Sequence, residues 1–147
     1  METKTLTRND FTERDGYLCY DSDFSFDGHV VIEGSLGWLK FARSVYAAGS
    51  LVIEAGSGIE AGEGIEAGSG IKAGWGIKAG SGIEAGWGIE AGFQIYAKWI
   101  SSKLRIFAGL CIWRLPTAKE QKIRAELRDG VIAFGEHVPP SKSEEAA

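Results

Sequence analysis

The centre of the chain repeats a six-residue unit, Ile-Glu/Lys-Ala-Gly-X-Gly, and this period limits what the chain can fold into. Isoleucine begins eight consecutive units, at residues 53, 59, 65, 71, 77, 83, 89 and 95. An α-helix needs apolar residues spaced near 3.6, and each glycine inside a helix costs about 1 kcal/mol relative to alanine. The hexapeptide repeat therefore predicts a non-helical, glycine-rich structure.

Within each unit the residues alternate between two sides of an extended chain. Isoleucine, alanine and the variable fifth residue share one side, while the charged residue and both glycines share the other. So short a unit buries its apolar side only by stacking on its neighbours. We therefore expect an all-β fold, a β-solenoid (a short-coil β-helix), with glycines at corners where positive φ is needed.

The number of units in one coil has to be inferred from the variable position. Three units per coil would stack residues 18 apart and mix sizes, as in the column Ser57, Trp75 and Phe93. Two units per coil would stack residues 12 apart and sort like with like, as in the column Trp75, Trp87 and Trp99. A spacing of 12 also places slightly more charged residues beside residues of opposite charge, and each such pair contributes about 0.2–1 kcal/mol. We favour a flattened 12-residue coil over an 18-residue coil.

The repeat continues into looser flanks. Gly-Ser-Leu units precede it, and irregular strand-like segments follow it. We place the solenoid at residues 30–113, after an acidic N-terminal segment at residues 1–29.

The C-terminal part reads as a cap for the open end of the solenoid. Thr117 and Glu120 have the spacing of a capping box, which predicts a helix through about Arg128 and then a strand. A helix-strand cap at residues 114–138 would keep the stack from polymerising. We expect the tail at residues 139–147 to be disordered.

Charge is distributed unevenly along the chain. The formal net charge of −4 is too small to indicate a DNA mimic or a nucleic-acid binder. Residues 1–36 hold eight acidic and three basic residues, whereas residues 98–128 hold eight basic and two acidic residues. We expect an electrically bipolar molecule. A possible basic patch for phosphates comprises Arg105, Arg114, Lys119, Lys122 and Arg124.

The variable position supplies the candidate binding surface. On a 12-residue coil its tryptophans would stack about 4.8 Å apart along one edge. That edge would be either exposed to a partner or covered by the cap. The candidate partner-binding residues are Trp75, Trp87, Trp99, Phe93, Lys72 and Lys78.

No pattern indicates catalysis or metal binding. The segment from Asp21 begins like a calcium loop, but Phe26 replaces the required glycine and Ile32 the required glutamate. The two histidines, His29 and His137, lie far apart in the sequence. Two cysteines are too few for a disulfide framework, and no signal peptide or membrane-length apolar segment is present. We expect a cytoplasmic protein with no enzymatic activity, no cofactor and no membrane contact.

The Gly34-Ser35-Leu36 unit, the Ile-Glu-Ala-Gly run and the segment Arg105–Leu110 together resemble small repeat proteins carried by bacteriophages and prophages. The resemblance covers about residues 30–110. It implies a small accessory protein that acts in the host cell, of the kind that includes anti-CRISPR and other anti-defence inhibitors. Such proteins work by occupying a surface. No functional residue carries over, because no motif aligns.

Three classes of function remain. The first is a non-enzymatic protein-binding module, a phage-encoded inhibitor that occludes a host protein such as a CRISPR-Cas or other defence component. The second is a structural protein, a virion part or a homo-oligomeric filament joined through open coils. The third is a nucleic-acid mimic or binder, which we do not expect because Lys72 and Lys78 interrupt the glutamates.

Overall fold

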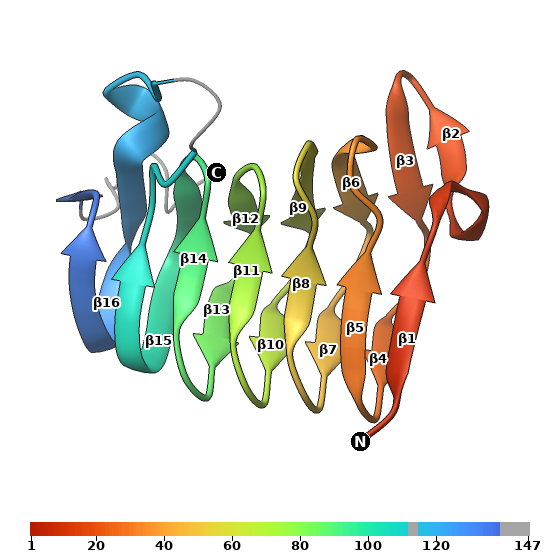
Figure 1. Ribbon diagram of the computed structural model, residues 1–147, viewed down its shortest axis with the longest axis horizontal. Helices are drawn as coiled ribbons and strands as arrows, with labels where there is room; N and C mark the ends of the chain where they lie inside the picture. Colours follow the sequence, from red (N-terminus) through yellow and green to blue (C-terminus); the bar gives the residue numbers. More distant parts are fainter. Residues whose placement is uncertain (112–114, 139–147) are drawn as a thin grey trace.

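The computed structural model describes residues 1–111 and 115–138, and these residues form a β-solenoid, as the repeat predicts. Its coils stack side by side along the long axis of the molecule, from the N-terminal coil to the C-terminal coil (Figure 1). Apart from two single turns of 3-10 helix, Arg8–Asp10 and Lys119–Gln121, the described elements are strands.

Each regular coil has three strands, which build three faces of parallel strands. Face 1 contains β4 (Phe24–Phe26), β7 (Val45–Ala47), β10 (Ile65–Ala67) and β13 (Gly82–Ala85). Face 2 contains β1 (Thr3–Leu6), β5 (His29–Ile32), β8 (Leu51–Ile53), β11 (Ile71–Ala73) and β14 (Ile89–Ala91). Face 3 contains β3 (Tyr17–Tyr20), β6 (Gly37–Phe41), β9 (Ser57–Ala61) and β12 (Ile77–Ala79).

The last two coils are each one long strand that bends through faces 3, 1 and 2 in turn. These strands are β15 (Ile95–Phe107) and β16 (Lys122–Phe134). Face 3 carries an extra short strand at both ends of the solenoid. There, β2 (Thr12–Arg14) pairs antiparallel with β3, and β17 (Glu136–Val138) pairs with β16.

The coil contains three repeat units, so the predicted two-unit coil is wrong. Ile65 pairs with Ile83, and Ile59 pairs with Ile77, so each isoleucine lies beside the one that begins the third unit after it. The N-terminal coils are slightly longer than three units, as the pairing of Val45 with Ile65 shows.

A three-unit coil tolerates variable residues of different sizes in one column because large rings lie over glycines of a neighbouring coil. A Cβ atom at Gly82 would lie 1.9 Å from Cε2 of Trp99. In the same way, Cβ atoms at Gly58 and Gly76 would lie 3.0 and 2.9 Å from the indole of Trp38. Each large ring therefore occupies the space that a side chain at the glycine would take, and it needs no ring of equal size in the next coil.

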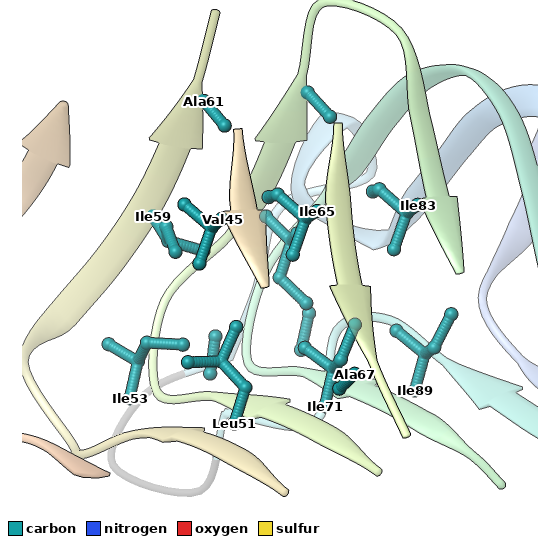
Figure 2. Close-up of a cluster of buried hydrophobic side chains, with 14 of the residues drawn as sticks. Val45, Leu51, Ile53, Ile59, Ala61, Ile65, Ala67, Ile71, Ile83 and Ile89 are labelled. Atoms are coloured by element: carbon teal, nitrogen blue, oxygen red, sulfur yellow. The ribbon is translucent and has the colours of Figure 1, made fainter. Parts of the chain in front are cut away.

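The predicted inward positions of isoleucine and alanine are confirmed. The eight repeat isoleucines are at most 1% exposed, and the alanines from Ala61 to Ala91 are at most 6% exposed. Figure 2 shows Ile59, Ile65 and Ile71 on successive strands within one apolar cluster. Full burial of one such side chain contributes about 1.5–3 kcal/mol. The variable residue does not share this side consistently, since Phe93 is 6% exposed and Trp87 is 65% exposed.

The repeat glycines do not serve the purpose that we predicted. Among the described residues, six glycines have positive φ, and only Gly56 of these belongs to the repeat. Instead, the glycine after each alanine lies against the backbone of the preceding coil. Cβ atoms at Gly86 and Gly92 would lie 2.0 Å from the carbonyl oxygens of Gly68 and Gly74. Glycine is needed here because the stacked corners leave no room for a side chain.

The predicted C-terminal helix is wrong. The capping box is present, since the Thr117 amide donates to Glu120 Oε1 at 3.0 Å and the Glu120 amide donates to Thr117 Oγ1 at 3.4 Å. However, it opens only one 3-10 turn, and the chain is strand from Lys122. Ile123 and Ala125 repeat the Ile-X-Ala pattern and are fully buried on the end of the stack. The open edge of β15 offers a full ladder of hydrogen bonds, whereas so short a helix is marginal.

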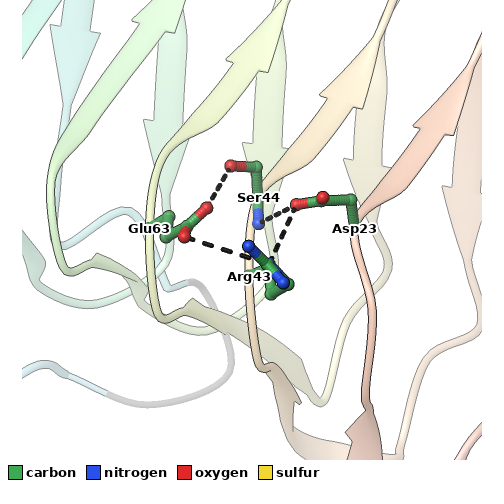
Figure 3. Close-up of polar contacts among 4 residues, drawn as sticks. All are labelled: Asp23, Arg43, Ser44 and Glu63. Atoms are coloured by element: carbon green, nitrogen blue, oxygen red, sulfur yellow. Dashed lines mark hydrogen bonds and ion pairs between the residues drawn. The ribbon is translucent and has the colours of Figure 1, made fainter.

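A polar ladder joins three coils at the corner between faces 3 and 1 (Figure 3). The Ser44 amide donates to Asp23 Oδ1 at 3.1 Å, and its hydroxyl donates to Glu63 Oε2 at 3.0 Å. Arg43 Nε lies 3.8 Å from Asp23 and 4.0 Å from Glu63. These side chains are half exposed, so each ion pair contributes at most about 1 kcal/mol. We interpret the ladder as a means of holding neighbouring coils in register.

Candidate binding surface

The three tryptophans of the predicted edge lie at three different corners. Trp75 follows β11 at the corner between faces 2 and 3, and Trp87 follows β13 at the corner between faces 1 and 2. Trp99 lies where β15 bends from face 3 to face 1. Because two repeat units span only two sides of a three-sided coil, the tryptophans do not form the predicted ladder.

Most of these rings pack against the solenoid. Trp75 is half-buried and meets Trp38 edge to face, with ring centroids 6.2 Å apart. Trp99 lies between Gly82 and Arg128, whose guanidinium carbon is 4.4 Å from the ring centroid. Such contacts stabilise the packing of adjacent coils.

The two predicted lysines also lie on different faces. Lys72 is on face 2, between Val52 and Glu90. Lys78 is on face 3, with Nζ 3.7 Å from Glu60 Oε1. The six predicted partner-binding residues therefore do not form one surface.

The basic patch is divided in the same way. Arg105 is exposed where β15 enters face 2, and Lys119 is in the 3-10 turn. Lys122 and Arg124 are on face 3, where the guanidinium of Arg124 lies 5.6 Å from the Tyr96 ring. Arg114 lies outside the described residues. The four described basic residues thus provide no continuous track for a nucleic-acid backbone.

The structure reveals an exposed apolar surface, of which the sequence indicated only Trp87. Trp87, Leu104 and Val131 are 65%, 55% and 62% exposed. They lie on three successive coils at the corner between faces 1 and 2. The Leu104 amide donates to the Trp87 carbonyl oxygen at 3.1 Å, and Arg105 pairs with Val131. We call Trp87, Leu104 and Val131 the corner ridge.

Charged side chains border the corner ridge. Lys103 and Arg105 are exposed on either side of Leu104, and Asp129 is exposed on the last coil. The centre of the ridge is therefore apolar, with two positive charges at its middle coil. A leucine between two basic residues gave no signal in the sequence, because it fits a buried strand residue equally well.

A wide groove of about 470 Å³ lies on face 2, beside the corner with face 3. Val52, Lys72, Glu90, Leu110 and Cys111 contribute to its walls. Lys72 and Glu90 are neighbours in register within this lining, so their opposite charges offset each other. The groove has no concentrated charge that would indicate one class of ligand.

Within residues 1–111 and 115–138, no three His, Cys, Asp or Glu side chains are placed to hold a metal ion. Across the same residues, no helix has the length and apolar character needed to cross a membrane. No protein-family model, curated protein or solved structure matches this chain.

Proposed function

We propose that this protein is a non-enzymatic binding module that recognises another protein through the corner ridge. The observation that carries the proposal is the exposure of Trp87, Leu104 and Val131 on three adjacent coils. Single exposed apolar residues are common, but aligned ones indicate an interaction surface. Tryptophan is enriched at binding hot spots, and a rigid coil loses little conformational freedom when it binds.

The charges beside the ridge define the kind of partner. Lys103 and Arg105 favour a protein whose apolar recess has an acidic rim, because complementary charges select the partner and speed its association. The resemblance to phage repeat proteins suggests that this partner is a host defence protein in the cytoplasm, such as a CRISPR-Cas component. Occupation of the partner's surface would then inhibit it.

Affinity capture from host lysate, followed by titration of the captured protein, tests this proposal. The double variant Trp87→Ala/Leu104→Ala should bind the partner at least roughly 30-fold more weakly, because loss of a hot-spot residue costs about 2 kcal/mol or more. Both residues are exposed, so the stability of the fold should change by no more than about 0.5 kcal/mol.

Tyr46→Ala is the matched control. Tyr46 is also exposed, at 39%, but it lies in the middle of face 1 and away from the corner ridge. This variant should bind as the wild type does. Equal capture by the double variant would exclude the corner ridge as the binding surface, and capture of nothing would contradict the proposed function.

A head-to-tail filament is the second candidate function. Sequence order follows the axis of the solenoid, so the acidic segment 1–36 and the basic segments 98–111 and 115–128 lie toward opposite ends, which attract. However, β2 and β17 both cover face 3, so a second copy cannot continue the ladder on all three faces. We expect one sedimentation coefficient over a hundredfold range of concentration, and growth with concentration would favour the filament.

A further inference from the structure

Face 3 carries a groove between two rows of outward side chains. Its volume is about 170 Å³, roughly that of six liquid water molecules. Successive positions of the first row are Tyr17, Trp38, Gly58, Gly76 and Gln94. Successive positions of the second row are Lys40, Glu60, Lys78 and Tyr96. The two consecutive glycines of the first row leave room for the ring of Trp38, which lies over them.

Trp38 forms the aromatic wall of this groove. The atoms Cζ3 and Cη2 of its indole lie over Gly58 and Gly76, so the ring extends along the trough that the glycines leave. Trp75 packs edge to face against the indole from the corner between faces 2 and 3. The half-buried ring is thus held in place, and part of its surface lines the groove.

Polar groups form the opposite wall and the end of the groove. Lys78 Nζ and Glu60 Oε1 are 3.7 Å apart. Gln94 lies beyond the two glycines of the first row. Its Cδ atom is 3.5 Å from the point where a Cβ atom at Gly76 would lie. Within the described residues, neither the Gln94 side-chain amide nor the Tyr96 hydroxyl has a hydrogen-bond partner. Both groups are therefore available to a ligand.

We infer that this groove binds a neutral saccharide, with one sugar ring against Trp38. The C–H face of a sugar stacks on an aromatic ring, and its hydroxyls both donate and accept hydrogen bonds. The lining supplies a carboxylate acceptor, an ammonium donor and an amide that does both. Glu60 and Lys78 offset each other's charge, and the nearby Lys40 ammonium lies 3.8 Å from the centroid of the Tyr17 ring. The groove therefore lacks the cluster of free cations that a phosphate ligand favours.

A glycan array with neutral and anionic members, probed with the labelled full chain, identifies the ligand class. We expect neutral glycans to bind, and their addition to change the tryptophan fluorescence with a saturating curve. The variant Trp38→Ala should bind about tenfold more weakly, because it removes the stacking surface. Gln94→Ala should weaken binding about fivefold, consistent with the loss of one neutral hydrogen bond.

Tyr46→Ala is the control, since the exposed Tyr46 lies on face 1, outside both proposed binding surfaces, and should leave glycan binding unchanged. Gln94→Ala keeps the test decisive if Trp38→Ala proves unstable, because the Gln94 side-chain amide has no hydrogen-bond partner among the described residues. Absence of any bound neutral glycan, preference for anionic glycans or nucleotides, or wild-type binding by Gln94→Ala would overturn the inference.

Discussion

Replacement of Gly86 by alanine should lower the free energy of unfolding by about 3 kcal/mol, the upper end of the range for overpacked sites. The new Cβ atom would lie 2.0 Å from the carbonyl oxygen of Gly68, so two coils would have to move apart. The same carbonyl belongs to a rigid backbone and cannot rotate away as a side chain can. Thermal unfolding measures the effect, which at roughly 2–4 °C per kcal/mol corresponds to a fall of about 6–12 °C in Tm.

Gly70→Ala is the matched control at the same corner of a neighbouring coil. Its Cβ atom would meet the Gly88 carbonyl oxygen at 3.4 Å, an ordinary van der Waals distance. We expect its unfolding free energy to stay within about 0.5 kcal/mol of the wild type. Equal losses of unfolding free energy in Gly86→Ala and Gly70→Ala would contradict the view that close contact between coils requires glycine at the first glycine position of each unit.

Replacement of Phe41 by alanine should lower the unfolding free energy by about 3–5 kcal/mol, the range for a buried aromatic ring. Phe41 is 2% exposed in the N-terminal part of the core, before the regular isoleucines begin. Its ring centroid lies 5.7 Å from Phe11, 5.5 Å from Tyr20 and 6.0 Å from Phe24. Truncation would therefore leave a cavity lined by rings that cannot all move to fill it.

Urea unfolding of Phe41→Ala and Tyr46→Ala measures this effect against an exposed ring. Tyr46→Ala should change the unfolding free energy by less than about 0.5 kcal/mol. Equal losses of unfolding free energy in the two variants would contradict the packing of Phe41 against Phe11, Tyr20 and Phe24 as a source of stability.

The sequence predicted the class of fold because alternation by two within each unit determines which side is buried. Isoleucine and alanine point inward in a two-unit coil as well as in a three-unit coil. The number of units per coil depends on what each ring meets in space. Trp99 lies against Gly82, but the two residues occupy different positions in their repeat units. A comparison of variable residues alone therefore favoured the wrong coil.

The C-terminal segment shows how tertiary contacts override a local signal. The capping box of Thr117 and Glu120 forms as predicted, but the exposed edge of β15 selects a strand. The Ile123-Arg124-Ala125 sequence repeats the inward pattern of the solenoid, and this was the signal that favoured β structure.

The six-residue period of the sequence does not predict the corner ridge. Trp87 belongs to the regular repeat, whereas Leu104 and Val131 lie in β15 and β16. A connection of irregular length separates these two coils, so counting in sixes does not relate Val131 to Leu104. The sequence identified one residue of the ridge, and only the stacking of the coils brings the other two beside it.

Cysteine crosslinking tests the three-sided coil most directly, because the positions of both proposed binding surfaces depend on it. In a chain whose Cys19 and Cys111 are replaced by serine, the pair Glu66→Cys and Glu84→Cys lies in register on adjacent strands of face 1. Neighbouring strands are about 4.8 Å apart, within the range that a disulfide spans.

The comparison pair is Glu66→Cys and Lys78→Cys, which would be in register in a two-unit coil but lie on faces 1 and 3 of this one. Mild oxidation followed by mass spectrometry should show an intramolecular disulfide in the first pair and none in the comparison pair. A disulfide in the comparison pair alone would contradict the three-sided coil, and with it the corner ridge and the groove on face 3.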